Sequence, residues 1–92
     1  MRLYYFSSDR GVTNFVFATS QERATELFLE VLIMSGVPPA NFWCRPMGAE
    51  ALVEPYRSRL REALALKQEG FGECHDRGGW RILSLADRIR QI

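Results

Sequence analysis

The sequence predicts an α+β, two-layer domain in which two helices cover one face of a mainly antiparallel, four-stranded sheet. Two aromatic, β-branched runs near the start, a capped amphipathic segment after them, and further alternation of strand-like and helix-like segments indicate this class. The predicted order is β-β-α-β-α-β, with the last residues forming either a short helix or a longer strand. A chain of 92 residues can bury a modest core, so we expect residues 1–92 to form a single domain.

The first two predicted strands form a hairpin. Residues 2–8 and 12–18 are rich in aromatic and β-branched side chains, and Gly11 between them can adopt the positive φ that a tight turn needs. Phe15 and Phe17 alternate with smaller residues along the second strand. We therefore expect the side of Phe15 and Phe17 to face the core.

Residues 19–36 predict the main helix. Thr19 and Glu22 have the spacing of a capping box, in which each side chain satisfies a backbone N–H of the first turn. Gly36 provides a stop, and the Pro38-Pro39 pair prevents the helix from continuing. The segment therefore has defined ends at both sides.

Helical periodicity divides this segment into two apolar sides. The side expected to meet the sheet consists of Ala24, Leu27, Phe28, Val31, Leu32 and Met34. Leu29 and Ile33 are four residues apart on the opposite side. Either another part of the chain or a partner protein is expected to cover these two side chains, since each would otherwise forgo about 1.5–3 kcal/mol of burial.

Two further elements follow. Residues 41–47 predict a third strand, and Pro46 favours either an edge position or a strand that stops there, because it cannot donate to a ladder. Residues 48–54 are ambiguous between a helical turn and a loop. Residues 56–69 predict a second helix after Pro55, with Gly70 as its stop. Its expected apolar face consists of Tyr56, Leu60, Ala63 and Leu64.

The C-terminal part begins with a predicted glycine-rich loop, residues 71–79. Residues 80–83 predict the fourth strand. Ser84 and Asp87 then have the spacing of a helix N-cap, which favours a short terminal helix. A strand that continues to Leu85 is the competing interpretation.

Composition excludes some function classes and leaves others open. The net charge of +1 gives no strong electrostatic case for nucleic acid or an anionic membrane. No apolar run approaches the roughly 20 residues of a membrane span, and no secretory signal is visible. We therefore expect a cytoplasmic protein without a cofactor or a membrane partner.

Reactive side chains concentrate at Glu73, Cys74, His75 and Asp76 in the predicted loop. Adjacent residues in an extended backbone point to opposite sides, so a Cys/His nucleophile would pair His75 with Cys44 instead. A Cys/His-dependent enzyme is kept as one alternative. The ligand spacing of a zinc site, such as CxxC, is missing, so we expect no bound metal.

A second alternative is a nucleic-acid-binding module. Arg57 and Arg61 are four residues apart on the second predicted helix, and Arg88 and Arg90 lie near the C-terminal end. Together they could contact a phosphate backbone. Acidic residues are interspersed with these arginines and would neutralise part of their charge.

The leading interpretation is a small non-enzymatic interaction protein that binds another protein or itself, as an inhibitor, adaptor or accessory factor of the kind phages and plasmids encode. Where aromatic neighbours alternate in a strand, one of each pair faces away from the helices, and Tyr5 and Trp43 are the candidates. Exposed aromatic patches often mark protein interfaces. The predicted interface residues are therefore Leu29, Ile33, Tyr5 and Trp43.

Overall fold

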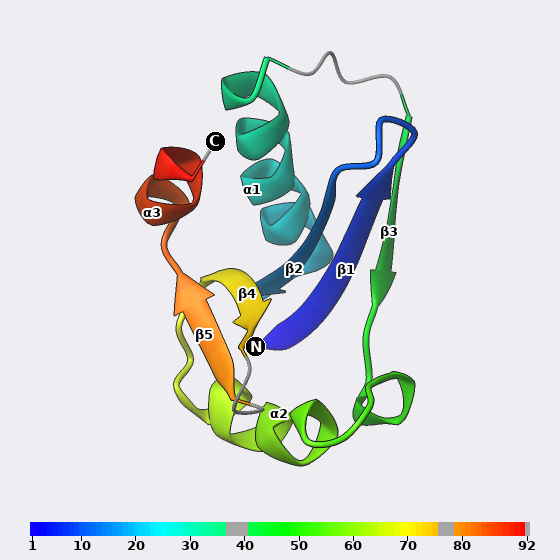
Figure 1. The fold of residues 1–92 in the computed structure, drawn as a ribbon, viewed down its shortest axis with the longest axis vertical. Coiled ribbons are helices and arrows are strands. Elements are labelled where there is room, and N and C mark those ends of the chain that lie inside the picture. Colours follow the sequence, from blue (N-terminus) through cyan, green and yellow to red (C-terminus); the bar gives the residue numbers. More distant parts are fainter. Residues whose placement is uncertain (37–40, 76–78, 92) are drawn as a thin grey trace.

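The computed structural model describes residues 1–36, 41–75 and 79–91 (Figure 1). The Pro38-Pro39 pair and Asp76 lie outside these residues. The elements are β1 (Arg2–Ser8), β2 (Thr13–Ala18), α1 (Gln21–Met34), β3 (Phe42–Pro46), the 3-10 helix η1 (Ala49–Ala51), α2 (Tyr56–Ala65), β4 (Gly70–Cys74), β5 (Trp80–Leu83) and α3 (Leu85–Arg90). The predicted class, a small α+β domain with an antiparallel sheet, is confirmed.

The described strands form one five-stranded sheet in the order β3-β1-β2-β4-β5, with every neighbouring pair antiparallel. The prediction of four strands was wrong because β4 lies in the segment expected to be a loop. Its glycines make room for neighbouring rings: a Cβ at Gly72 would lie 2.8 Å from the Phe17 ring and 3.1 Å from the Trp80 ring. The edge position predicted for the strand that ends at Pro46 is confirmed.

Helix α1 covers one face of the sheet. Its buried residues are Ala24, Leu27, Phe28, Val31 and Leu32, five of the six predicted from periodicity. They pack on Tyr4 and Phe6 of β1 and on Val16 and Ala18 of β2. This is the opposite side of β2 from Phe15 and Phe17, so the predicted core face was wrong for this helix.

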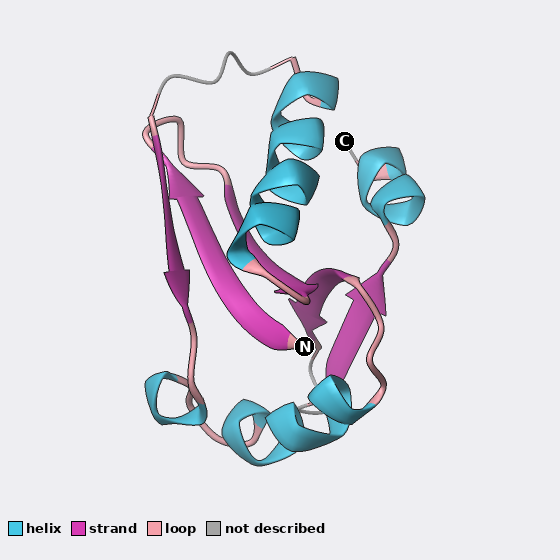
Figure 2. Ribbon diagram, turned by 180° about the vertical axis from the view of Figure 1, so that it is seen from behind, coloured by secondary structure: helices cyan, strands magenta, loops and turns pink. Residues whose placement is uncertain are grey.

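Helix α2 packs against the other face, which contradicts the expectation that both helices share one face. Leu60 and Ala63 of α2 form a second core with Leu3, Phe17 and Leu52. Alternation along β1 and β2 sends Leu3 and Phe17 to the side away from α1. Figure 2 shows α2 at the lower end of the sheet, well away from α1. The central strands therefore carry apolar side chains on both faces.

The ends of α1 differ from the prediction in detail. Its N-cap is Ser20 and not Thr19: the Ser20 hydroxyl accepts a hydrogen bond from the Arg23 N–H at 3.1 Å. At the other end Gly36 has a φ of +74°, as its predicted role as a stop requires. Met34, expected in the core, is 54% exposed because it lies in the last turn beyond the sheet contacts.

The other two α-helices agree with the prediction only in part. Helix α2 ends at Ala65, four residues before its predicted end at Glu69, and Lys67 takes a positive φ of 50°. Glu69 instead accepts two hydrogen bonds from Arg23, at 2.9 and 2.8 Å. The Ser84 hydroxyl accepts from the Asp87 N–H, so the terminal-helix prediction is confirmed and the competing strand was wrong.

No helix in the described part of the chain combines the length and the apolar character that a membrane span requires.

Candidate interaction surface

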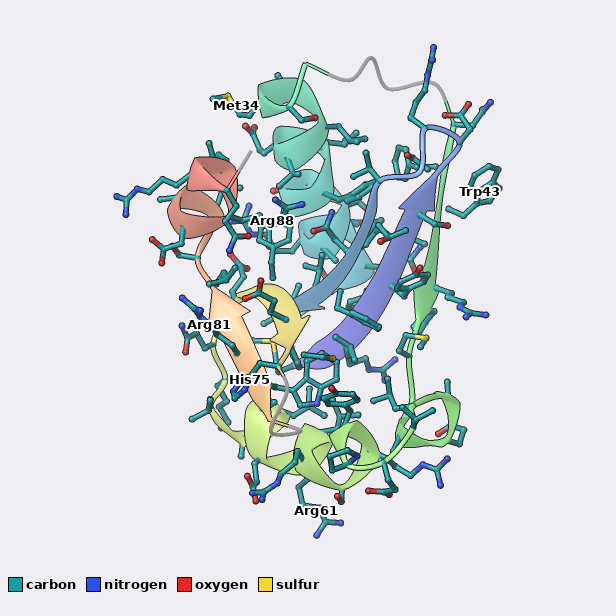
Figure 3. All side chains as sticks on the ribbon, viewed as in Figure 1. Met34, Trp43, Arg61, His75, Arg81 and Arg88 are labelled. Carbon is teal, nitrogen blue, oxygen red and sulfur yellow. The ribbon has the colours of Figure 1, made fainter. Side chains whose placement is uncertain are left out.

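One end of the sheet face opposite α1 is left uncovered by α2. We call this surface the open face: it consists of Tyr5, Ser7, Phe15, Trp43 and Arg45, which occupy paired positions on β1, β2 and β3. Trp43 is 59% exposed and projects beside β3 (Figure 3). The ring centres of Tyr5 and Phe15 are 5.1 Å apart, and the Arg45 guanidinium carbon lies 5.8 Å from the Tyr5 ring centre. The open face is therefore aromatic with one cation.

The open face borders the free edge of β3. The Met47 N–H donates to the Leu3 carbonyl at 2.9 Å, and the Asp9 N–H donates to the Asn41 carbonyl at 3.1 Å. Hydrogen-bonded and non-hydrogen-bonded pairs alternate in an antiparallel ladder. The backbone groups of residues 43 and 45 therefore face β1, while those of residues 42, 44 and 46 face outward.

These outward groups form a short edge without a neighbouring strand among the described residues. Phe42 and Cys44 each present an N–H and a C=O group, and Pro46 presents only its carbonyl. Trp43 and Arg45 project onto the open face beside this edge. A polypeptide added at β3 would thus contact both backbone groups and side chains.

The structure separates the predicted pair on α1. Leu29 is half-buried and packs against the first core, as does Leu85 of α3, which lies beside α1 (Figure 1). Ile33 is 61% exposed. Part of the second side of α1 is therefore covered within the chain, whereas Ile33 and Met34 at the end of the helix remain exposed.

The four predicted phosphate-contacting arginines also fall into two groups. Arg57 and Arg61 lie on α2, whereas Arg88 and Arg90 lie on α3 at a different end of the sheet; Figure 3 labels Arg61 and Arg88. Arg88 donates to the Asn14 side-chain oxygen at 3.0 Å, and Arg90 pairs with Asp87 at 3.2 Å. The structure does not bring the four together as one basic surface.

Cys44 and Cys74 are free and well separated. β1 and β2 lie between their strands, and three strand spacings amount to about 14 Å. Burial raises the pKa of both thiols, which leaves them largely protonated at neutral pH. The strand order therefore gives no support to a pairing of Cys44 with His75, which follows β4.

The described residues contain no group of three His, Cys, Asp or Glu side chains arranged to hold a metal ion.

One concave site was missed in the sequence. Between the start of β1, the end of β3 and helix α2 lies a depression of about 770 Å³, lined among others by Leu3, Met47, Arg57 and Leu64. We call it the α2 depression. The sequence indicates only one wall of this depression, since Arg57 and Arg61 flank the apolar face of the second predicted helix. Residues 1–3 and 46–49 form the other walls, and only the fold brings them next to α2.

No protein-family model matches this sequence, and neither a curated protein nor a solved structure matches it. Function is therefore inferred from the geometry of the described residues.

Proposed function

We propose that this is a non-enzymatic interaction protein that binds an extended polypeptide along the free edge of β3, and that a second copy of the chain is its partner. The observation that carries the proposal is the outward alternation of backbone groups on β3, next to the exposed Trp43. A backbone in extended conformation is the ligand whose donors and acceptors repeat with the same spacing.

A second copy fits this edge because β3 is self-complementary. Antiparallel pairing centred on Cys44 would join the outward groups of Cys44 in the two copies by two hydrogen bonds. The N–H of Phe42 would donate to the carbonyl of Pro46 in the other copy; Pro46 has no N–H to return the second bond, so each 42–46 pair would be joined by one hydrogen bond. The pairing continues the antiparallel order of the sheet.

Side chains complement each other in the same arrangement. Trp43 of one copy would lie opposite Arg45 of the other, on the same face of the joined sheet. An indole and a guanidinium attract each other, with about 0.5–1 kcal/mol at an exposed site. Two such pairs would arise by symmetry, since residue 43 meets residue 45 on both sides of the axis.

The edge can be tested without disturbing the ladder to β1. Cys44→Pro removes an outward N–H, and the strand already accepts a proline at residue 46, which has the same orientation. Each copy would lose a hydrogen bond of about 0.5–1.5 kcal/mol, or about 1–3 kcal/mol for the dimer, so association should weaken by about fivefold to a hundredfold. Cys44→Val, which keeps the N–H, is the matched control.

Light scattering over a range of protein concentrations measures the association, and circular dichroism checks that each variant is folded. We expect wild type and Cys44→Val to associate alike and Cys44→Pro to remain monomeric at the concentrations where the wild type begins to associate. A wild-type protein that stays monomeric at every concentration would refute the second copy as partner. If a folded Cys44→Pro variant associated as strongly as the wild type, contact through the β3 edge would be refuted.

Oxidative crosslinking gives an independent readout. Directly opposed residues in a hydrogen-bonded pair have Cα atoms about 5.5 Å apart, within the range that a disulfide can bridge. Cys74→Ser protein should therefore form a covalent dimer through Cys44 under mild oxidation, whereas Cys44→Ser protein should not.

A further inference from the structure

The α2 depression has the size and lining of a small-molecule site. Its volume of about 770 Å³ lies within the range of roughly 300–1,000 Å³ typical of ligand pockets. It shares no residue with the open face, and Pro46 is its one lining residue that also belongs to the outward edge of β3. Binding in the α2 depression does not require a partner at β3.

The floor of the depression is apolar. Leu3 and Leu60 are 2% and 5% exposed and belong to the second core, and Met47 and Leu64 are half-buried against that core. An apolar group placed on this floor would extend the second core and be removed from water.

Its charged lining residues are all cationic. They are Arg2, Arg57 and Arg61, and the ion pairs formed within the described chain include none of the three. Two acidic groups adjoin the lining: the Glu54 carboxylate accepts a hydrogen bond from Ser58 at 2.8 Å, and the Glu50 carboxylate lies against Gly48. The rim therefore carries an excess of positive charge over an apolar floor.

One of these arginines is held in place by the backbone. The Arg57 Nε–H points at the carbonyl oxygens of Ala49 and Leu52, at 3.1 and 3.0 Å. This contact fixes the guanidinium beside η1 and leaves its terminal NH₂ groups as donors for another acceptor. A guanidinium oriented in this way is suited to a carboxylate or a phosphate.

We infer that the α2 depression binds a small anionic amphiphile, a molecule with an apolar body and one carboxylate or phosphate head. The apolar body would lie on Leu3, Met47 and Leu64, and the head would contact Arg57 and Arg61 at the rim. A neutral amphiphile would leave the arginines without a partner, and a small anion alone would leave the floor empty.

The experiment uses octanoate, 1-octanol and acetate as probes, followed by amide chemical shifts of the protein. We expect octanoate to shift the amides of Leu3, Met47 and Leu64, 1-octanol to bind at least tenfold more weakly, and acetate to shift none of them. Equal binding of octanoate and 1-octanol, no measurable octanoate binding, or shifts confined to other residues would each overturn the inference. Octyl phosphate then distinguishes a phosphate head from a carboxylate head, and binding of either amphiphile supports the inference.

Arg61→Gln tests the cationic rim, and Arg59→Gln is the matched control. Arg59 is on the same helix but pairs with Glu62 at 3.3 Å and is not part of the depression. We expect Arg61→Gln to weaken octanoate binding severalfold and Arg59→Gln to leave it unchanged. If both variants reduced octanoate binding equally, binding would reflect general charge and the inference would be overturned. Leu64→Glu, which places a negative charge on the floor, should abolish octanoate binding while the amide shifts of α1, which packs on the other face of the sheet, stay native.

Discussion

Replacing Phe28 with alanine is expected to lower the free energy of unfolding by about 3–5 kcal/mol. The Phe28 side chain is fully buried between α1 and the sheet. Its ring stacks on Phe6 at 4.6 Å and contacts Phe42 at 5.5 Å, so it joins the helix to both β1 and the edge strand. Removal would leave a cavity that rigid strands cannot close.

Urea denaturation followed by circular dichroism measures this change, and Ile33→Ala on the same helix is the control. Ile33 is 61% exposed, so its truncation should change stability by no more than about 0.5 kcal/mol. For a domain of this size, a loss of 3 kcal/mol would lower the melting temperature by at least about 12 °C. Similar losses for the two variants would contradict the assignment of the core face of α1.

Gly70→Ala should be nearly as damaging, with an expected loss of about 3 kcal/mol. Gly70 is buried at the start of β4 with a φ of +158°, and a Cβ there would overlap the carbonyl oxygen of Leu83 on β5. A backbone atom cannot rotate away as a side chain can. The β4–β5 pairing would have to shift to accept the methyl group.

The control for this variant is Gly11→Ala, in the turn between β1 and β2. Gly11 also has a positive φ, +79°, but nothing lies within 4 Å of its would-be Cβ. Only the conformational cost of about 1–2 kcal/mol is expected there. Comparing the urea midpoints of the two variants separates backbone overlap from φ strain, and equal midpoints would contradict the close approach of β4 and β5.

Local signals were sufficient to predict much of the fold. The buried residues of α1 follow from a 3.6-residue period, Gly36 from its freedom at positive φ, and the edge position of β3 from the missing N–H of Pro46. Ser84 capping of α3 likewise needs only the contact between a hydroxyl and an N–H three residues away. Each of these features depends on a few consecutive residues.

The features that were missed depend on distant parts of the chain. Gly70 and Gly72 resemble loop residues by themselves, and their place in a strand is explained only by Leu83, Phe17 and Trp80 on the neighbouring strands. The placement of α2 on the face opposite α1 likewise depends on how residues 49–65 cross the end of the sheet. No short-range pattern carries this information.

For the candidate sites the same limit applies. Alternation correctly predicts that Tyr4 and Tyr5 lie on opposite faces of the sheet, as do Phe42 and Trp43, because alternation is a property of a single strand. That Tyr5, Trp43 and Arg45 adjoin each other follows from the pairing of β1 with β3, which the sequence does not specify. Their role in binding remains a prediction.

The alternating edge of β3 also determines how its amides exchange with deuterated water. The N–H groups of Trp43 and Arg45 bond to β1 and should exchange slowly, whereas those of Phe42 and Cys44 face outward and should exchange fast in the free protein. A bound strand would slow the second pair and abolish the alternation. If Phe42 and Cys44 stayed fast in a solution where the protein is associated, contact through this edge would be refuted. Amide exchange at these four residues therefore shows directly whether this edge of the sheet is open or paired.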